Sequence, residues 1–308
     1  MSFLYLLENI RAPWLDKFFL AVTSLGEETI FIIIGLLFFW CIDKYEGYYI
    51  LSVGFIGTVV NQFLKILCCV PRPWVKDPNF TIVEEAREAA SGYSFPSGHT
   101  QSSVGVFGSV ARWNKNHALR IACIALCILI PFSRMYLGVH TPADVLVSIA
   151  VALLLIFVVH PVIKKSETNA RIMWALIGVM LALSLTLLLF VNLYNFPADI
   201  DMHNYESALK NGYTLTGCIL GLAVVYFFDS KYIHFKTDAV LWAQLLKLVG
   251  GAALVFAIKA GLKVPLNSLI GHEGIARLLR YFIMVTVAGA VWPLTFKWFS
   301  KLGKVKNI

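Results

Sequence analysis

The stretch Ser94-Phe95-Pro96-Ser97-Gly98-His99-Thr100 stands between a charged segment and an apolar run. Ser97 is suited to capping a helix that starts at Gly98, because serine is a preferred N-cap residue. Glycine lets a ligand approach the backbone closely, and a helix N-terminus favours an anion. His99 adds a side chain that titrates near neutral pH. The stretch indicates a site that binds phosphate and moves a proton, although a capped helix with an interfacial histidine explains it as well.

The composition is that of a membrane protein. Of the 308 residues, 58% are hydrophobic and 14% are charged, whereas globular domains are about 45–50% apolar and about 25% charged. The net charge of +8 comes from Lys and Arg that flank apolar runs, which favours membrane orientation over nucleic-acid binding. The six cysteines show no paired Cys-x-x-Cys spacing, so we expect neither a zinc site nor redox chemistry.

Apolar runs of roughly membrane length recur along most of the chain. A bilayer is crossed by about 20 apolar residues, with about 17–25 tolerated. The runs lie at 27–42, 48–69, 98–113, 119–135, 143–163, 171–193, 212–228, 239–261 and 276–296. They predict an all-α, polytopic membrane helical bundle with about nine transmembrane helices. Residues 1–25 instead mix charges with apolar residues spaced by three and four, which predicts amphipathic helices on the bilayer surface.

Basic residues gather in every second connection between these runs. They are Lys44; Arg112, Lys115 and Arg120; Lys164, Lys165 and Arg171; Lys231 and Lys236; and Lys297 with the lysines after it. Because basic connections stay in the cytoplasm, we expect an extracytoplasmic N-terminus and a cytoplasmic C-terminus. Three polar segments then share the extracytoplasmic face: 65–73, 94–100 and 133–144.

The first of these segments contains Lys65 and Arg72. Arg72 is seven positions after Lys65, which is about two turns and therefore near the same helix face if the helix continues that far. Pro71 and Pro73 end the helix and stiffen the backbone around Arg72. A lysine point charge and a planar guanidinium suit the oxygens of a phosphate. Snorkelling of both side chains to the membrane interface explains the pattern without a ligand.

The third segment predicts a helix start at Thr141-Pro142, since proline favours the first helical position. Asp144 then falls in the first turn, where it can form a variant capping box with Thr141. It can also accept a hydrogen bond from one nitrogen of His140, which would leave the other nitrogen as a nucleophile. The two roles are compatible. Arg134 adds a further guanidinium at the end of the preceding run.

Together the segments read K-x6-R-P from Lys65 to Pro73, P-S-G-H from Pro96 to His99, and S-R-x5-H-x3-D from Ser133 to Asp144. In order and spacing they resemble the type 2 phosphatidic-acid phosphatase superfamily. That superfamily includes lipid phosphate phosphatases, glucose-6-phosphatase and the vanadium haloperoxidases. The resemblance covers roughly residues 26–163 and implies a helical core in which the three motifs meet.

The resemblance also implies a role for each matched residue. His140 would be the nucleophile that forms a phosphohistidine, Asp144 would orient it, and His99 would be the general acid. The phosphoryl oxygens would be held by five residues: Lys65, Arg72, Ser97, Gly98 and Arg134. No metal or other cofactor is implied. The physical argument agrees, because phosphoryl transfer depends chiefly on positioning and charge stabilisation.

We therefore expect three parts: an interfacial segment at 1–25, a catalytic core at 26–163, and additional C-terminal transmembrane helices at 164–308. A nine-span layout is similar to that of glucose-6-phosphatase, and sphingosine-1-phosphate phosphatases also extend past the core. The outer connection 194–211 could cover the site, select head groups or remain solvated. It carries Asp199, Asp201, His203, Glu206 and Lys210.

The expected function is metal-independent hydrolysis of a phosphate monoester at the extracytoplasmic face of a membrane, and the compact connections favour a bacterial inner membrane. A lipid phosphate is the favoured substrate, because a site beside apolar helices can receive a head group sideways from the outer leaflet. A soluble sugar phosphate is the alternative substrate. A non-catalytic anion-binding transporter is the alternative class, and a haloperoxidase would need bound vanadate. Beyond the substrate and the bilayer, no nucleic-acid partner is expected.

Overall fold

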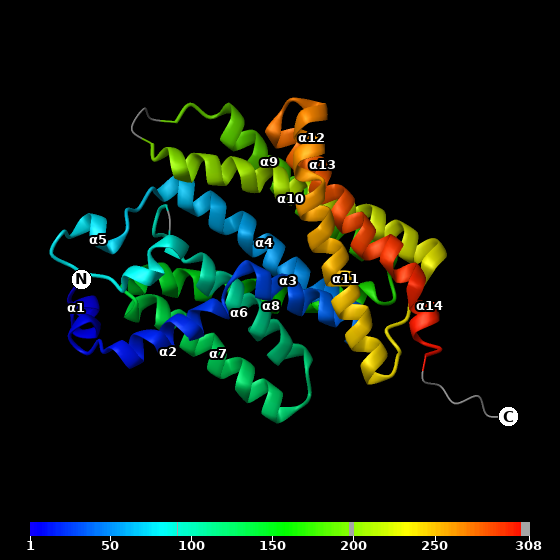
Figure 1. Ribbon diagram of the computed structural model, residues 1–308, viewed down its shortest axis with the longest axis horizontal. Coiled ribbons are helices and arrows are strands. Elements are labelled where there is room, and N and C mark those ends of the chain that lie inside the picture. The colour runs from blue at the N-terminus through cyan, green and yellow to red at the C-terminus, as the bar shows by residue number, and fades with distance from the viewer. Residues whose placement is uncertain (91, 197–199, 303–308) are drawn as a thin grey trace. The chain divides into compact units, whose positions relative to one another are not determined.

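The computed structural model describes residues 1–90, 92–196 and 200–302. These ranges form helices joined by turns and loops, with no β-strand among them (Figure 1). The all-helical class expected from the sequence is confirmed. Asp199 and the tail 303–308 lie outside the described residues.

The helices follow one another in this order. The first half contains α1 (Ser2–Asn9), α2 (Pro13–Ser24), α3 (Glu28–Leu37), α4 (Lys44–Cys68), α5 (Pro73–Lys76), α6 (Gly98–Trp113), α7 (His117–Tyr136) and α8 (Pro142–Ser166). The second half contains α9 (Ala170–Leu193), α10 (Met202–Phe228), α11 (Leu241–Gly261), α12 (Lys263–Ile270), α13 (Glu273–Thr286) and α14 (Phe296–Phe299). Short 3-10 or π segments extend several of these helices.

Seven helical segments in the described chain are long and apolar enough to cross a membrane. They span Lys44–Lys76, His117–Tyr136, Pro142–Ser166, Ala170–Leu193, Met202–Ile233, Leu241–Ile270 and Glu273–Phe299. Helix α2 and the segment Glu28–Ile42 form a pair bent by 48°, which makes an eighth if it counts as one span. The chain is therefore an integral membrane protein. The expected number of nine spans is not confirmed.

The run at 98–113 accounts for part of the difference. It forms α6, a helix of 16 residues, which is about 24 Å long at 1.5 Å per residue. The hydrocarbon core of a bilayer is about 30 Å thick. Most residues of α6 are buried, and α6 packs along α7 (Figure 1). Helix α6 is therefore an interior helix whose N-terminus is surrounded by protein.

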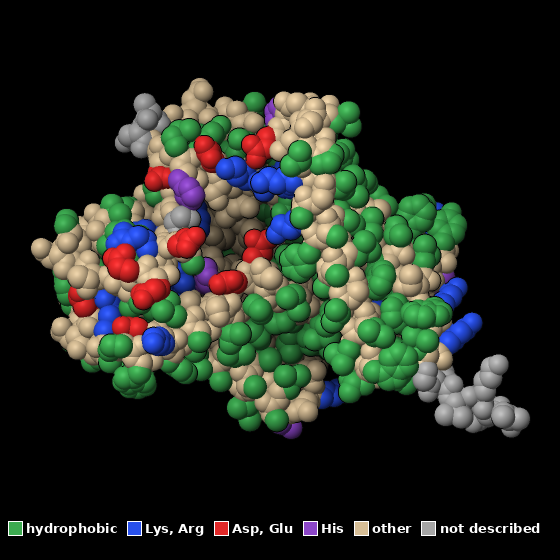
Figure 2. Space-filling view, in the orientation of Figure 1, with side chains coloured by type: hydrophobic (Ala, Val, Ile, Leu, Met, Phe, Trp, Pro, Cys, Tyr) green, Lys and Arg blue, Asp and Glu red, His purple; other side chains and the backbone are tan. Residues whose placement is uncertain are grey.

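The outer faces of α7 and α8 are apolar, as expected of helices that contact lipid. Figure 2 shows hydrophobic side chains over α7. Exposed apolar side chains on the two helices include Ile121, Ile124, Ile128, Leu146, Leu154 and Phe157. Burying such a surface in hydrocarbon is favourable at about 25 cal/mol per Å².

The chain divides into two compact units. The first contains residues 1–32, 49–161 and 194–208, and the second contains residues 33–48, 162–193 and 209–308. All three motifs fall in the first unit. The segment 194–208 also belongs to this unit, although the sequence analysis assigned it to the C-terminal part of the chain.

Residues 1–25 form α1 and α2 and contribute to the first unit. Phe19 of α2 packs against Phe132 and Tyr136 of α7, with ring centroids 5.5 and 4.3 Å apart. Leu4 of α1 is buried beside Phe80. Part of the apolar face predicted for this segment is thus covered by protein, and its place at the bilayer surface stays a prediction.

In the second unit, two of the connections expected in the cytoplasm lie together. The Lys44 ammonium is 2.7 Å from a carboxylate oxygen of Asp229. The Thr237 hydroxyl donates to the carbonyl of Ile42 at 3.0 Å, and the Gln244 amide donates to the carbonyl of Cys41 at 3.1 Å. The connections after residue 42 and after residue 228 are therefore on the same side of this unit.

Candidate functional site

The third motif forms the turn from α7 into α8. Gly138 closes α7 with a positive φ of 82°, a conformation that glycine adopts without strain. The Thr141 amide donates to Asp144 Oδ2 at 2.7 Å, and the Asp144 amide donates to Thr141 Oγ1 at 3.3 Å. This is the reciprocal pairing of a capping box. The structural role considered for Asp144 is therefore present.

The same carboxylate also faces His140. Asp144 Oδ2 lies 3.5 Å from His140 Nδ1, and both residues are only 1% exposed. The Ser94 hydroxyl donates to this oxygen as well. Asp144 therefore caps α8 and contacts the imidazole with one oxygen atom, so the two interpretations of this residue hold together.

Arg72 approaches His140 from the other side of the ring. Its Nη1 lies 2.9 Å from His140 Nε2 and donates to the carbonyl of Val139 at 2.9 Å. A guanidinium has donors only, so His140 Nε2 must be the acceptor. The hydrogen-bond network thus assigns the ring proton to Nδ1, which faces Asp144.

The residues just before the second motif hold both cations of the first motif. Arg72 Nε donates to the carbonyl of Gly92 at 2.8 Å, and Lys65 Nζ donates to the carbonyl of Tyr93 at 2.7 Å. The Ser94 amide donates to the carbonyl of Val70 at 2.7 Å. Residues 92–94 therefore connect Lys65 and Arg72 of the first motif to Asp144 of the third motif.

Ser97 and Gly98 start α6 as predicted. The Ser97 hydroxyl accepts from the Thr100 amide at 3.4 Å, which is an N-cap bond. The Ser97 amide donates to the carbonyl of Asp144 at 3.2 Å. A Cβ added at Gly98 would meet only Asn61 Oδ1, at 3.9 Å. The protein around Gly98 therefore leaves room for another group beside this helix terminus.

Several buried polar atoms of the motifs lack a hydrogen-bond partner in the described chain. They are Nε and Nη2 of Arg134, Nε2 of His99 and Nδ1 of His140. Arg134 is fully buried, and of its guanidinium nitrogens only Nη1 donates to a protein side chain, Thr23 Oγ1, at 2.8 Å. Buried polar groups usually have partners, and exceptions need an explanation. Guanidinium donors of this kind suit the oxygens of an anion.

The protonation of His140 depends on its burial and on the cations of the motifs. Burial lowers the pKa of His140 well below its ordinary value. The positive charges of Arg72, Arg134 and Lys65 lower this pKa further. His140 is therefore neutral at physiological pH, as the acceptor role of Nε2 requires.

All eight residues predicted for the site thus come together in the first unit: Lys65, Arg72, Ser97, Gly98, His99, Arg134, His140 and Asp144. Gly92 and Tyr93 were not predicted to contribute, because no spacing in the sequence marks them. Ser94 lay within the polar segment 94–100 but was given no role. Among the described residues, no group of three or more His, Cys, Asp or Glu side chains could hold a metal ion.

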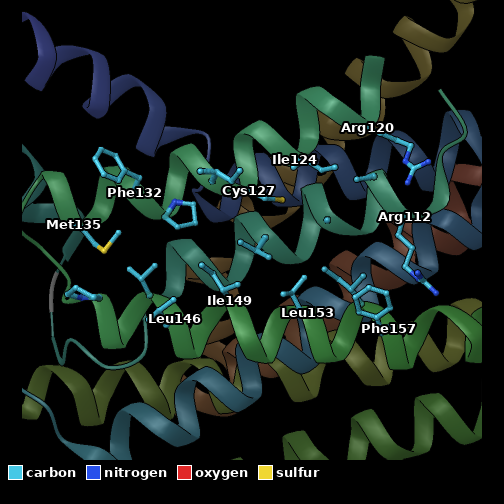
Figure 3. A pocket seen from close by; sticks show the side chains of 18 of the residues that line it. Arg112, Arg120, Ile124, Cys127, Phe132, Met135, Leu146, Ile149, Leu153 and Phe157 are labelled. Atoms are coloured by element: carbon cyan, nitrogen blue, oxygen red, sulfur yellow. The ribbon is translucent and has the colours of Figure 1, made fainter. Parts of the chain in front are cut away.

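A long apolar groove with a volume of about 760 Å³ lies among α6, α7 and α8. Figure 3 shows Phe132 and Met135 at one end and Arg112 and Arg120 at the other. Met135 follows Arg134 directly in the chain, so the first end is close to the third motif. Between the ends the wall is almost wholly aliphatic or aromatic.

The fold and the site define a class of protein: a helical integral membrane protein with a buried, cation-rich site. Residues 46–168 match the PAP2 superfamily, and residues 213–304 match the PAP2 superfamily phosphatase, transmembrane extension. The chain belongs to the PAP2 superfamily. No solved structure matches it significantly.

Curated relatives share part of the chain. Phosphatidylglycerophosphatase B of Bacillus subtilis is 30% identical over 166 residues, which are 49% of this chain and 76% of the relative. Undecaprenyl-diphosphatase BcrC of the same organism is 33% identical over 104 residues, 34% of this chain and 51% of the relative. Sphingosine-1-phosphate phosphatase 2 of Homo sapiens is 24% identical over 163 residues, 51% of this chain and 39% of the relative. The chain thus spans about half or less of the last two relatives.

Proposed function

We propose that the protein is a lipid phosphate phosphatase that transfers the phosphoryl group to His140 at the extracytoplasmic face of its membrane. The observation that carries the proposal is the line Arg72–His140–Asp144. In this line, Nδ1–H faces a carboxylate, and Nε2 keeps its lone pair beside a guanidinium. An anion-binding transporter needs no such oriented imidazole.

In the first step, His140 Nε2 attacks phosphorus and the bond from phosphorus to the leaving oxygen breaks. His99, protonated while the anionic phosphate is bound beside it, donates a proton to that oxygen, so the lipid leaves as an alcohol or, from a diphosphate, as a monophosphate. Asp144 stabilises the imidazole, which gains positive charge as the new P–N bond forms. In the second step, His99 accepts a proton from water, and the water oxygen displaces His140 to release inorganic phosphate.

The charge of the phosphoryl group is matched by three cations and a helix terminus. We assign the phosphoryl oxygens to Lys65, Arg72 and Arg134, and to the backbone beside Ser97 and Gly98. The unpartnered donors of Arg134 and the open space at Gly98 support this assignment. Preorganised donors in a site of low dielectric constant stabilise the transition state without reorganisation.

A lipid substrate is supported by the groove and by the relatives. The groove begins near the third motif and is long and apolar, so it can take a hydrocarbon chain while the phosphate stays among the cations. The names of the three relatives all denote hydrolysis of a phosphate carried by a lipid. We propose a bacterial inner membrane as the location.

The extracytoplasmic face is supported by the distribution of basic residues. The connections rich in Lys and Arg are expected in the cytoplasm, and two of them contact each other through Lys44 and Asp229. The three motifs lie in the other connections, which the same rule assigns to the opposite face.

The test is phosphate release by the detergent-purified protein. We expect turnover of phosphatidic acid, phosphatidylglycerophosphate, a polyprenyl diphosphate or sphingosine 1-phosphate, with at least one of them preferred strongly over glucose 6-phosphate. Slow and equal turnover of every ester would contradict a lipid preference. Full activity of His140→Ala would contradict the mechanism.

A further inference from the structure

Asn204 belongs to the first turn of α10, in a segment that neither family match covers, since the matches end at 168 and resume at 213. The Asp201 carboxylate caps this turn by accepting from the Asn204 amide at 2.9 Å. Asn204 is only 7% exposed although it follows an outer connection. A solvated loop does not explain that burial.

The Asn204 side chain is fixed on the backbone of residues 92 and 93. Its Oδ1 accepts from the Tyr93 amide at 2.7 Å. Gly92 has a φ of 75°, and a Cβ there would collide with the Asn204 amide group. The Asp201 amide donates to the Tyr93 hydroxyl at 3.2 Å, which ties the same turn to α10 a second time.

The two peptide carbonyls of this turn hold the cations of the site. The carbonyl of Gly92 accepts from Arg72 Nε, and the carbonyl of Tyr93 accepts from Lys65 Nζ. The turn therefore has Asn204 on its amide side and two cations on its carbonyl side. Moving the turn would move both cations, because each has a bond to it shorter than 3 Å.

A small polar cavity of about 50 Å³ adjoins this arrangement, lined by Gln62, Lys65, Ile66, His203, Asn204, Ser207 and Ala208. Asn204 Nδ2 is buried and has no partner among the residues that the structure describes. A cavity of this size has room for an ordered water, which could join Asn204 Nδ2 to the polar wall of the cavity. Asn204 and Lys65 are thus neighbours across a single cavity as well as through Tyr93.

We propose that Asn204 is a positioning residue of the phosphate site, acting through the Gly92–Tyr93 turn on Lys65 and Arg72. The inference rests on the proposed function, because it takes these two cations as the groups that hold the phosphoryl oxygens. Asn204 itself touches no reacting atom. The start of α10 thereby becomes part of the active site of the enzyme.

The experiment compares Asn204→Ala, Asn204→Asp and the control Asn192→Ala in the full-length protein. Asn192 is an exposed asparagine that donates to the carbonyl of Leu188 in its own helix. We expect Asn204→Ala to lower kcat/KM by about 10- to 100-fold, since small displacements of positioning groups have effects of that size. Asn204→Asp keeps an acceptor for the Tyr93 amide and should recover most of the loss, and Asn192→Ala should match the wild type.

A double variant separates positioning from simple destabilisation. With Lys65→Met already in place, Asn204→Ala should cost less than it does alone, because the two residues act on the same oxygens. Equal costs in both backgrounds would overturn the proposal. So would equal losses for Asn204→Ala and Asn204→Asp. If Asn204→Ala fails to fold, Asn204→Ser, whose shorter side chain does not reach the Tyr93 amide, takes its place in both comparisons.

Orthovanadate binding distinguishes a failure of this inference from a failure of the proposed function. The readout is the rise in melting temperature of each variant with vanadate. If the wild type binds vanadate but hydrolyses no ester, the proposed function fails, while weaker vanadate binding by Asn204→Ala still supports the positioning role. If the wild type is active and Asn204→Ala equals it in both assays, only the positioning role fails.

Discussion

Arg72 Nη1 lies 2.9 Å from His140 Nε2, the nitrogen that we assign as the nucleophile. The arginine therefore has two functions. Without substrate it keeps the imidazole in the tautomer with the proton on Nδ1, and with substrate it can transfer its donor to a phosphoryl oxygen. This relationship joins the first and third motifs, which lie 68 residues apart.

Replacing Arg72 with lysine should be nearly as damaging as removing it. The guanidinium bonds at once to Gly92, Val139 and His140, and an ammonium cannot reproduce this planar set of donors. We expect Arg72→Lys to lower kcat/KM by at least about 100-fold. The matched control is Arg87→Lys, an exposed arginine that pairs with Glu84. A mild effect of Arg72→Lys would show that charge alone suffices.

Variants of Asp144 and Thr141 should separate an effect on catalysis from an effect on helix capping. Asp144→Asn keeps an oxygen for the Thr141 amide but loses the charge that faces His140, so kcat should fall by about 10²- to 10⁴-fold with little loss of stability. Thr141→Ala removes the capping hydroxyl and should lower stability by about 1 kcal/mol with activity largely kept. Melting temperature and phosphate release measure the two effects. The reverse pattern would mean that Asp144 serves only as a cap.

Gly98→Ala should reduce activity without reducing stability. The protein leaves space for a Cβ at this position, and alanine favours a helix over glycine by up to about 1 kcal/mol. The new methyl group would occupy the space assigned to the phosphoryl group, so vanadate affinity and kcat/KM should fall by about 10-fold or more. Gly178→Ala is the control, because a Cβ there meets nothing within 4 Å and Gly178 lies outside the site. Unchanged activity of Gly98→Ala would place the phosphate elsewhere.

The ligand-free protein should lose stability at mildly acidic pH through His140. Burial lowers the pKa of this side chain in the folded state, whereas the unfolded chain binds a proton below about pH 6.5. The contribution is complete above that value and is lost as the pH falls, at up to about 1.4 kcal/mol per pH unit. The melting temperature of His140→Gln should therefore depend less on pH between 7 and 5. The exposed His117→Gln is the control, and an unchanged slope for His140→Gln would show that His140 binds a proton equally in the folded and unfolded chains.

The sequence contained enough information to predict the all-helical class and the meeting of the three motifs. Each motif couples a local signal to a specific chemistry. Thr141-Pro142 marks a helix start, Ser97 marks an N-cap, and an arginine between two prolines marks a rigid guanidinium. These local signals agree with the bonds that the structure contains.

The contribution of Asn204 could not be predicted in this way. It depends on a contact between residues 93 and 204, which are 111 positions apart, and the surrounding sequence is that of an ordinary polar connection. The interior position of α6 could not be predicted from the sequence for a similar reason. A run of moderate hydropathy reads the same whether it faces lipid or is buried by neighbouring helices, and only packing separates the two.

The most direct test of the account is to detect the covalent intermediate. The purified protein is mixed with its best lipid phosphate, quenched within milliseconds in alkali, where phosphohistidine is stable, and digested for mass spectrometry. We predict phosphate on the peptide that contains His140 in the wild type, and none on that peptide in His140→Ala. Phosphate on another residue, or steady turnover by His140→Ala, would contradict the mechanism.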